Sequence, residues 1–189
     1  GESNENKNIK IFKNKKDVSK INIKLYKSII KEDELDDLIE NLNKKSAISV
    51  DTETSSLNPL KAKLVGISFC TEPNKAYYIP IAHNKNKNLK LDFVIKKIKP
   101  ILEDTSIKKI GQNIKYDYIV LKNHGIELDP IEDTMLLSYV LDAGNNRHNM
   151  DTLSELHLSH KTISYKDIVG TGKKQLNFSD INIKDATEY

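Results

Sequence analysis

The chain has 189 residues and a net charge of +3, with 38% hydrophobic and 30% charged residues. This length and composition suit one soluble globular domain with its own core. No apolar run approaches the roughly 18 residues that a membrane span needs, and the N-terminus lacks an apolar signal-peptide core, so we expect a cytoplasmic protein with no membrane partner.

The charge and the rare residues set further limits. A net charge of +3 admits a nucleic-acid partner without demonstrating one. The single cysteine, Cys70, cannot form an internal disulfide, and its apolar surroundings predict a small core residue in a reducing compartment. Arg147 is the only arginine in the sequence, which suggests that a planar guanidinium is needed there.

The first part of the chain divides into an arm, a strand and a helix. Residues 1–20 are rich in Lys and Asn without a sustained period, which predicts a linker or a loosely attached arm. Residues 21–29 are typical of a strand. Residues 32–45 predict a helix, because apolar side chains recur every three or four positions, acids fill the first turns and lysines fill the last.

The middle of the chain predicts three strands close together, at 47–53, 63–70 and 76–82. Their connections are rich in turn residues, so we expect an antiparallel meander. Residues 91–104 follow as a helix, with Pro100 as a kink or break. The remaining elements are a short strand at 107–112 and helices at 113–125, 134–144, 150–158 and 181–189. This order predicts an α/β (α+β) domain over residues 21–189, with a mixed sheet flanked by helices.

Two acids, Asp51 and Glu53, fall on the same face of the first strand of the meander, opposite its apolar face. Like charges at this spacing repel unless a cation lies beside them, and carboxylate oxygens suit Mg²⁺ or Mn²⁺. A bare D-x-E tripeptide, however, more often marks a strand face that is simply wet.

Two further aspartates call for different interpretations. Asp117 falls near the inward stripe of its helix, beside Ile114 and Leu121. A buried carboxylate needs a partner, so we expect either such a partner or a position at the stripe edge that reaches water. Asp133 directly precedes an apolar helical segment, which favours a helix N-cap over a metal ligand.

Six segments together carry a family resemblance that covers residues 22–189. They are SVDTETSSLNPLKAKLVGISF, IGQNIKYDYIVL, EDTMLLSYVL, RHNMDTLSE, KTISYKDIVGTGKKQLNF and ATEY. In order and spacing they resemble the 3′–5′ proofreading exonuclease domain of bacterial family A DNA polymerase I. The resemblance implies the RNase H-like fold of the DEDD exonucleases.

The resemblance also implies a two-metal site. Asp51 and Glu53 match the first motif, Asp117 matches the second, and Tyr189 matches the tyrosine of the third motif, Y-x-x-x-D. The family uses two divalent cations, Mg²⁺ or Mn²⁺ with Zn²⁺ as a further candidate, and the tyrosine bonds the attacking water. The aspartate of the third motif would lie beyond Tyr189, so we expect this chain alone to be a weak or silent nuclease.

The implied substrate is a single-stranded or frayed 3′ end of DNA, and the implied partner is a polymerase domain in the same monomeric chain. By resemblance, Leu57 wedges against the terminal base and Phe178 stacks on a neighbouring base. Without the resemblance, Leu57 and Phe178 would both more often be interpreted as core residues. The residues matched to DNA contacts are Thr54, Leu57, Gln112, Asn113, Tyr116, Arg147 and Phe178. For Asn113, helix capping is an equally good explanation.

Two alternatives to a proofreading domain stay open on the sequence. The first is a catalytically weak or dead exonuclease-like domain that supports a polymerase structurally. The second is a stand-alone DEDD exonuclease that acts on RNA. Asp51, Glu53, Asp117 and Tyr189 argue against the first, and polymerase motifs after Tyr189 would exclude the second.

Overall fold

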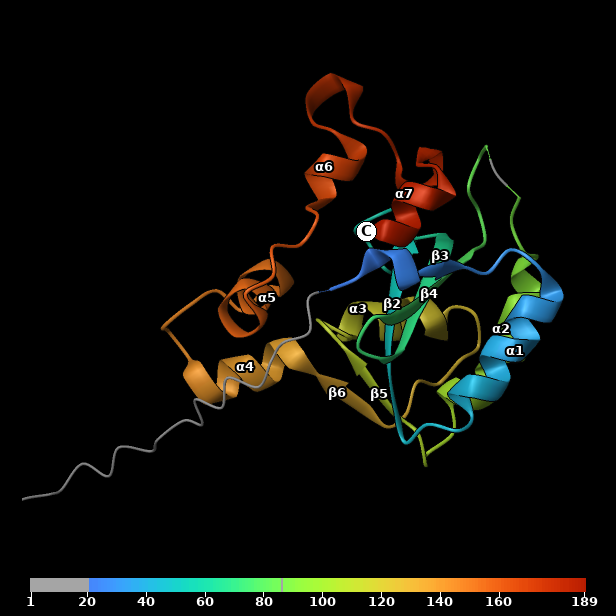
Figure 1. Ribbon diagram of the computed structural model, residues 1–189, viewed down its shortest axis with the longest axis horizontal. Coiled ribbons are helices and arrows are strands. Elements are labelled where there is room, and N and C mark those ends of the chain that lie inside the picture. Colours follow the sequence, from blue (N-terminus) through green and yellow to red (C-terminus); the bar gives the residue numbers. More distant parts are fainter. Residues whose placement is uncertain (1–20, 86) are drawn as a thin grey trace, which may run out of the picture.

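A six-stranded mixed sheet forms the centre of the computed structural model, which describes residues 21–85 and 87–189 (Figure 1). The strand order is β1-β4-β3-β2-β5-β6. The neighbours β2, β3 and β4 pair antiparallel, which confirms the predicted meander. On either side of it, β1 pairs parallel with β4, and β5 and β6 extend the sheet in parallel from β2. The arm predicted at 1–20 lies outside the described residues.

The bounds of β2, β3, β4 and β5 follow the predicted strands closely. The strands are β1 Lys27–Ser28, β2 Ala47–Thr54, β3 Leu64–Glu72, β4 Lys75–Pro80, β5 Lys108–Gly111 and β6 Ile131–Asp133. The short β6 was not predicted from the sequence. It contains three residues and exists because it pairs with β5, a contact that local sequence does not reveal.

Seven α-helices surround the sheet in the described part of the chain. They are α1 Glu32–Leu42, α2 Leu91–Leu102, α3 Lys115–Lys122, α4 Thr134–Asp142, α5 Met150–Leu158, α6 Tyr165–Val169 and α7 Ile183–Glu188. Three 3₁₀ turns accompany them: η1 Ile23–Leu25, η2 Gly172–Lys174 and η3 Phe178–Asp180. Among these helices of the described residues, none is long and apolar enough to span a bilayer.

The larger core lies between the sheet and the helices α1, α2 and α3. Ile48 and Val50 of β2 are buried in it, as the strand pattern predicted, against Leu35 of α1 and Ile98 of α2. The first turn of α1 is fixed by Glu34, whose carboxylate accepts hydrogen bonds from the N–H groups just before the helix. This face supplies most of the buried apolar surface.

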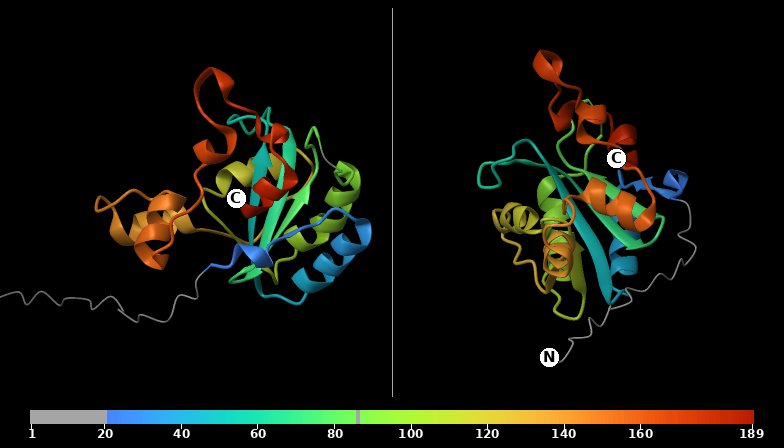
Figure 2. Two further views of the ribbon diagram at one scale, coloured as in Figure 1. Left: turned by 45° about the horizontal axis from the view of Figure 1, so that its top comes forward. Right: turned by 90° about the vertical axis from the view of Figure 1, so that its left-hand side faces the viewer.

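The opposite face of the sheet carries a smaller core. Its members are Val65, Tyr78, Val169, Phe178, Ile181 and Ala186. They come from β3, β4 and the segment of α6, η3 and α7, which lies across this face near the C-terminus (Figure 1). In Figure 1 and in the left view of Figure 2, α4 and α5 lie on the β6 side of the sheet, away from α1 and α2. The sheet is therefore covered by long helices on one face and by short ones on the other.

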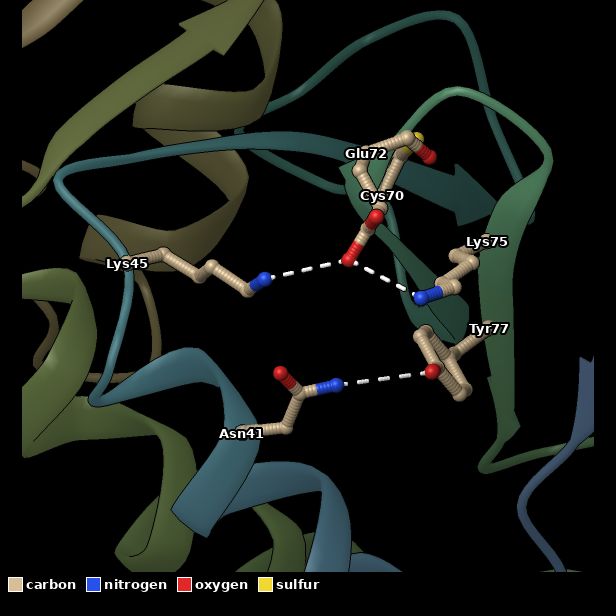
Figure 3. A network of polar contacts seen from close by, with 6 residues as sticks. All are labelled: Asn41, Lys45, Cys70, Glu72, Lys75 and Tyr77. Carbon is tan, nitrogen blue, oxygen red and sulfur yellow. Dashed lines mark hydrogen bonds and ion pairs between the residues drawn. The ribbon is translucent and has the colours of Figure 1, made fainter.

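A polar network closes the turn between β3 and β4 (Figure 3). Glu72 accepts ion pairs from Lys75 and Lys45, both at 3.1 Å, and these bonds lower the pKa of its carboxyl. Cys70 is half-buried rather than fully buried in the core as predicted, and its thiol donates to the Glu72 carbonyl at 3.2 Å. The network lies at the C-terminal end of β3, far from Gly66 and from Glu53, the partner of Gly66 on β2.

Three sequence predictions need correction. The strand predicted at 21–29 is reduced to β1, because the preceding residues form η1, which the Asn22 side chain caps. Pro100 neither breaks nor ends α2, which continues to the buried Leu102. The helix predicted at 113–125 is shorter, since α3 ends at Lys122 and Gly125 follows it with φ +75°.

Gly66 of β3 has no room for a side chain, and this yields a stability prediction. A Cβ atom there would lie 2.0 Å from the hydroxyl of Tyr78, which is itself 3% exposed. We expect Gly66→Ala to lower the free energy of unfolding by about 1–3 kcal/mol through overpacking. Urea unfolding of the variant measures this loss. Ser49→Ala, an exposed change on β2, is the control, and equal stability of both variants would refute the packing argument.

Candidate active site

Asp51 and Glu53 project from the face of β2 that carries the smaller core. Their cross-strand partners on β3 are Ser68 and Gly66, and these small residues leave space above the strands. A cavity of about 140 Å³ results, lined in part by both acids and by Tyr78 and Tyr189. The two acids are half-buried, so this face is neither a dry core nor the simply wet face of the alternative interpretation.

Asp117 reaches β2 from α3 at a point where the sheet is open. β5 pairs with β2 only as far as Ser49. Further along, the Asp117 carboxylate accepts hydrogen bonds from the Thr52 N–H at 2.9 Å and from the Thr52 hydroxyl at 2.6 Å. Asp117 is 2% exposed, so the sequence expectation of a buried carboxylate with a partner is confirmed, and the alternative of a water-exposed position is excluded.

The three carboxyl groups form a centre of uncompensated negative charge. Among residues 21–85 and 87–189, no Lys or Arg forms an ion pair with Asp51, Glu53 or Asp117. Burial, reinforced by the Asp117 charge, raises the pKa of Asp51 to about 7. Burial and then the Asp51 charge raise the pKa of Glu53 to about 9. Each acid thus destabilises the charged form of its neighbour.

Hard divalent cations fit this donor set. Carboxylate oxygens are the ligands that Mg²⁺ and Mn²⁺ prefer, and a cation would relieve the repulsion that raises these pKa values. The three acids do not form a ready-made metal cluster, however. In the described part of the chain, no group of three His, Cys, Asp or Glu side chains is close enough to hold an ion. Asp51 and Glu53 share the cavity, whereas Asp117 remains bonded to Thr52.

The rings of Tyr165, Phe178 and Tyr189 pack against one another, and Tyr189 lines the cavity of the carboxylates. Phe178 is 1% exposed, which supports the core role and leaves its ring unavailable for stacking on a base. Tyr165 stacks on Phe178 from outside, with ring centroids 6.4 Å apart and planes inclined by 11°. Tyr165 is 42% exposed and lies edge-on to Tyr189, 6.5 Å between centroids.

Sequence reasoning missed Tyr165 together with the short helix α6 that it begins. One signal was present: the S-x-x-D pattern of Ser164 and Asp167 forms a capping box, in which each side chain bonds the other's backbone N–H. The helix places Tyr165 at its first position, beside the site. Burial and the Glu53 charge raise the pKa of the Tyr165 hydroxyl, which is consistent with this proximity.

The loop after β2 is held by Tyr116, one of the predicted DNA-contact residues. Its hydroxyl bonds the Thr54 hydroxyl at 2.5 Å and donates to the Ser56 carbonyl. Thr54 and Tyr116 thus have structural partners within the chain. Leu57, at the tip of this loop, is 96% exposed, so its side chain is free to meet a ligand as the resemblance implies.

The turn between β5 and α3 is organised by Gln112. Its amide donates to the His148 carbonyl at 2.7 Å and accepts from the Thr134 hydroxyl at 2.5 Å. These bonds tie the loop that contains the exposed Arg147 to the start of α3, near Asp117. Gln112 therefore has a structural role, and the loop with Arg147 lies close to the second motif.

Asp133 is the N-cap of α4, as predicted, because its carboxylate accepts from the Met135 N–H at 2.8 Å. It also accepts from the N–H groups of Asn113 and Ile114, each at 3.0 Å, which the sequence did not reveal. Asp133 thus takes the capping role that was the alternative for Asn113. The Asn113 side chain is left exposed, on a backbone with φ +56°.

Comparison with known sequences identifies relatives over most of the chain. A family described as 3′-5′ exonuclease matches residues 26–189. DNA polymerase I of Borreliella burgdorferi is 43% identical over 165 residues, which cover 87% of this chain and 18% of that protein. DNA polymerase I of Rhizobium leguminosarum is 38% identical over 175 residues, covering 82% of this chain and 17% of that protein. The chain thus spans less than a fifth of these relatives.

Solved structures of nucleases share the fold. Escherichia coli RNase D, an exoribonuclease, superposes with a TM-score of 0.60 at 22% identity, over 75% of this chain and 35% of that one. Brucella melitensis NrnC with bound Mg²⁺ superposes with a TM-score of 0.53 at 25% identity, over 64% of this chain and 57% of that one. The predicted fold class, a mixed sheet flanked by helices, is confirmed.

The raised pKa values make the stability of the metal-free chain depend on pH. Glu53 has a pKa of about 9 in the folded chain against an ordinary value of 4.5, so the folded state retains a proton that the unfolded state releases. This contribution is complete below about pH 4 and is lost as pH rises through 9. We expect Glu53→Gln to reduce the loss of unfolding free energy between about pH 6 and 9, measured by urea unfolding in EDTA.

Glu40→Gln is the matched control for this measurement. Glu40 is exposed, and its bond to Lys44 lowers the pKa of its carboxyl, so it remains ionised throughout that range. Its replacement should leave the slope of stability against pH unchanged. If stability fell equally steeply with pH in the original chain and in Glu53→Gln, the pKa of Glu53 would not be raised in the folded chain.

Proposed function

Because this chain belongs to the family of 3′–5′ exonuclease domains of DNA polymerase I, we propose that it removes nucleotides from the 3′ end of single-stranded or frayed DNA. The proposed reaction is hydrolysis of the terminal phosphodiester with two divalent cations, Mg²⁺ or Mn²⁺. The observation that carries the proposal is the pair of acids, Asp51 and Glu53, in a cavity beneath Tyr189 without a compensating cation from the chain.

The carboxylates of Asp51, Glu53 and Asp117 would hold the cations. The chemistry that such cations supply when bound is activation of water and stabilisation of the leaving 3′ oxygen. The three acids interact with one another electrostatically, since Asp117 raises the pKa of Asp51 and both aspartates raise the pKa of Glu53. Asp117 would have to exchange at least one bond to Thr52 for a ligand or for a bridging water.

Tyr189 and Glu53 would orient the attacking water. Burial, followed by the charges of Glu53 and Asp51, raises the pKa of the Tyr189 hydroxyl far above neutrality. The hydroxyl is therefore protonated at the pH of the cell and acts as a hydrogen-bond donor or acceptor, not as a base. The Glu53 carboxylate would be charged once a cation is bound. It could then accept a hydrogen bond from the attacking water, on the side of the water away from Tyr189.

The substrate would be gripped by stacking and wedging, which do not depend on sequence. Leu57 and Tyr165 are both exposed, Leu57 on the loop after β2 and Tyr165 on α6. A terminal base between an apolar wedge and an aromatic face gains stacking energy whatever its identity. Arg147 and the amide of Asn113 are exposed near the second motif and suit contacts to phosphate.

The proposed context is a longer protein, as in the bacterial relatives. These relatives are DNA polymerase I, of which this domain forms 17–18%. We therefore propose a polymerase region in the same monomeric chain and a bacterial cytoplasm that contains the DNA. The fourth carboxylate implied by the third motif would come from sequence after Tyr189, so the 189 residues alone would cleave weakly.

An exonuclease acting on RNA is the less favoured candidate. Its support is the shared fold of RNase D, at 22% identity. The sequence relatives at 37–43% identity are all DNA polymerase I. A structural domain without activity is disfavoured because an acid held at a pKa of about 9 without a function would destabilise the fold at neutral pH.

Removal of Asp51 should abolish cleavage. In a polymerase-length form of the protein, we expect Asp51→Ala to lower the rate by a factor of at least about 1,000, because it removes one of the three carboxylates that would hold the cations. The measurement is release of nucleotides from a 3′-labelled single strand during titration with Mg²⁺ or Mn²⁺. The 189-residue chain, run in parallel, should show weak activity at every metal concentration.

Asp36→Ala serves as the control for loss of an acid. Asp36 is exposed on α1, where it pairs with Lys97, and takes no part in the carboxylate centre, so its replacement should leave the rate unchanged. Full activity of Asp51→Ala would refute the metal assignment. A deoxyribose strand that resists cleavage while the matching ribose strand is degraded would favour the RNA exonuclease.

Tyr165 should contribute to substrate binding through its ring and not through its hydroxyl. We expect Tyr165→Ala to raise KM for a single strand by about 5- to 100-fold, the equivalent of about 1–3 kcal/mol of base stacking, and Tyr165→Phe to leave KM unchanged. A strand with an abasic 3′ end offers no terminal base, so Tyr165→Ala should bind it as the original protein does. An equal loss on both strands would contradict stacking.

A further inference from the structure

We propose that His83 is a positioning residue that holds Tyr189 over the carboxylates, through a chain of hydrogen bonds from Tyr78 to the backbone before α7. The inference rests on the proposed function, because it assigns a task to His83 in that reaction. His83 follows β4 and is 3% exposed, yet it belongs neither to the carboxylate centre nor to the larger core. A buried, fully bonded histidine beside a candidate active site calls for a physical explanation.

The two hydrogen bonds of the His83 ring indicate which of its nitrogens carries the hydrogen. Its Nδ1 lies 2.8 Å from the Ile181 carbonyl oxygen, and its Nε2 lies 2.7 Å from the Tyr78 hydroxyl. A carbonyl can only accept, so Nδ1 carries the hydrogen and donates it. Burial lowers the pKa of His83, which favours the neutral ring. In the neutral ring Nε2 accepts, and the Tyr78 hydroxyl therefore donates to it.

One end of this chain lies at the carboxylates. The ring of Tyr78 crosses β3 above Gly66, where no side chain intervenes, and Gly66 is the cross-strand partner of Glu53. Tyr78 also lines the cavity that contains Asp51 and Glu53. Burial, and then the Glu53 charge, raises the pKa of the Tyr78 hydroxyl, so the hydroxyl remains a donor to His83.

The other end lies at the start of α7. Ile181 is separated from α7 by Asn182 alone, and Tyr189 directly follows the last residue of that helix. The neighbour of His83, Asn84, strengthens the connection: its N–H donates to the Ser179 carbonyl at 2.8 Å, and its amide donates to the Asp180 carboxylate at 2.7 Å. His83 and Asn84, which follow β4, thus bond the segment 179–181, which precedes α7.

Within residues 21–85 and 87–189, few other polar contacts tie α7 to the sheet. One further bond, between the hydroxyls of Ser28 and Thr187 at 2.8 Å, joins the helix to β1. The backbone of α7 runs without interruption from its N-cap Asn182 to Tyr189, whose N–H bonds the Asp185 carbonyl, so a shift at Ile181 would be passed on to Tyr189. A displacement of about 1 Å at a catalytic group can reduce a rate by about 100-fold. The hydrogen bonds of His83 therefore bear on catalysis through Tyr189.

Three substitutions in the full-length protein test the proposal by graded removal of the bonds. Tyr78→Phe removes the bond to Nε2, His83→Asn retains an N–H for the Ile181 carbonyl, and His83→Leu removes both. We expect kcat on a single-stranded oligonucleotide to fall about tenfold in His83→Leu and about two- to threefold in the two milder variants. KM should change less than kcat, because Leu57 and Tyr165 hold the base independently.

Combination with Tyr189→Phe separates positioning from general destabilisation. If His83 acts through Tyr189, the His83 and Tyr78 substitutions should have no further effect on kcat once the Tyr189 hydroxyl is absent. Tyr77→Phe is the matched control: Tyr77 adjoins Tyr78 on β4, and its hydroxyl accepts from Asn41 on the opposite face of the sheet (Figure 3). Tyr77→Phe should leave kcat unchanged both in the original protein and in the Tyr189→Phe variant.

The outcomes are distinct. Effects that multiply with Tyr189→Phe, or equal losses in His83→Leu and Tyr77→Phe, would overturn the positioning role while the proposed function stands. A full-length protein that does not cleave single strands, or that is indifferent to Tyr189→Phe, would overturn the proposed function itself. Circular dichroism checks that each variant is folded, and if His83→Leu is not, Tyr78→Phe and His83→Asn decide the question alone.

Discussion

Electrostatic repulsion among Asp51, Glu53 and Asp117 is the constraint around which this face of the molecule is built. No basic side chain of the described residues pairs with these acids, and burial raises the pKa of each. A chain selected for stability alone would replace at least one of them or pair it with a lysine. The arrangement is understandable if the missing countercharge is a divalent cation, which explains the small partners Ser68 and Gly66 on β3.

The two faces of the sheet divide stability and function between them. The larger core, beneath α1, α2 and α3, fixes β2 and so fixes the direction in which its acids point. The smaller core supports residues near the acids: Phe178 lies beneath Tyr165, and Ala186 belongs to the helix that leads to Tyr189. Elements on this face are short, so their positions depend on specific bonds such as those of His83 and Asn84.

Polar side chains that resemble ligands often turn out to be structural supports. Asp133 caps two helices, Gln112 ties a distant loop to α3, and Tyr116 holds the loop after β2. Each lies near the carboxylates and shapes the surface from which Leu57 and Arg147 are exposed. These residues influence a substrate through the position of others, so their replacement would alter several contacts at once.

The sequence by itself determined the elements that local periodicity encodes. The meander, α1, α2 and the burial of Ile48 and Val50 follow from the alternation of side chains along strands and helices. The D-x-E acids, Asp117 and the N-cap at Asp133 were also identified, because charged residues on an apolar pattern are visible without tertiary information. The family resemblance added Tyr189, which lies at the cavity.

Only the tertiary structure decided which of two aromatic rings is accessible and what holds the last helix. Tyr165 and Phe178 are both aromatic residues near turns, and their exposure depends on how α6 folds back over η3. The bond between His83 and Ile181 joins residues 98 positions apart, and no local pattern encodes such a contact. Local patterns specify what each segment becomes, whereas the packing of distant segments specifies which side chains meet, and that packing set the surroundings of the carboxylates.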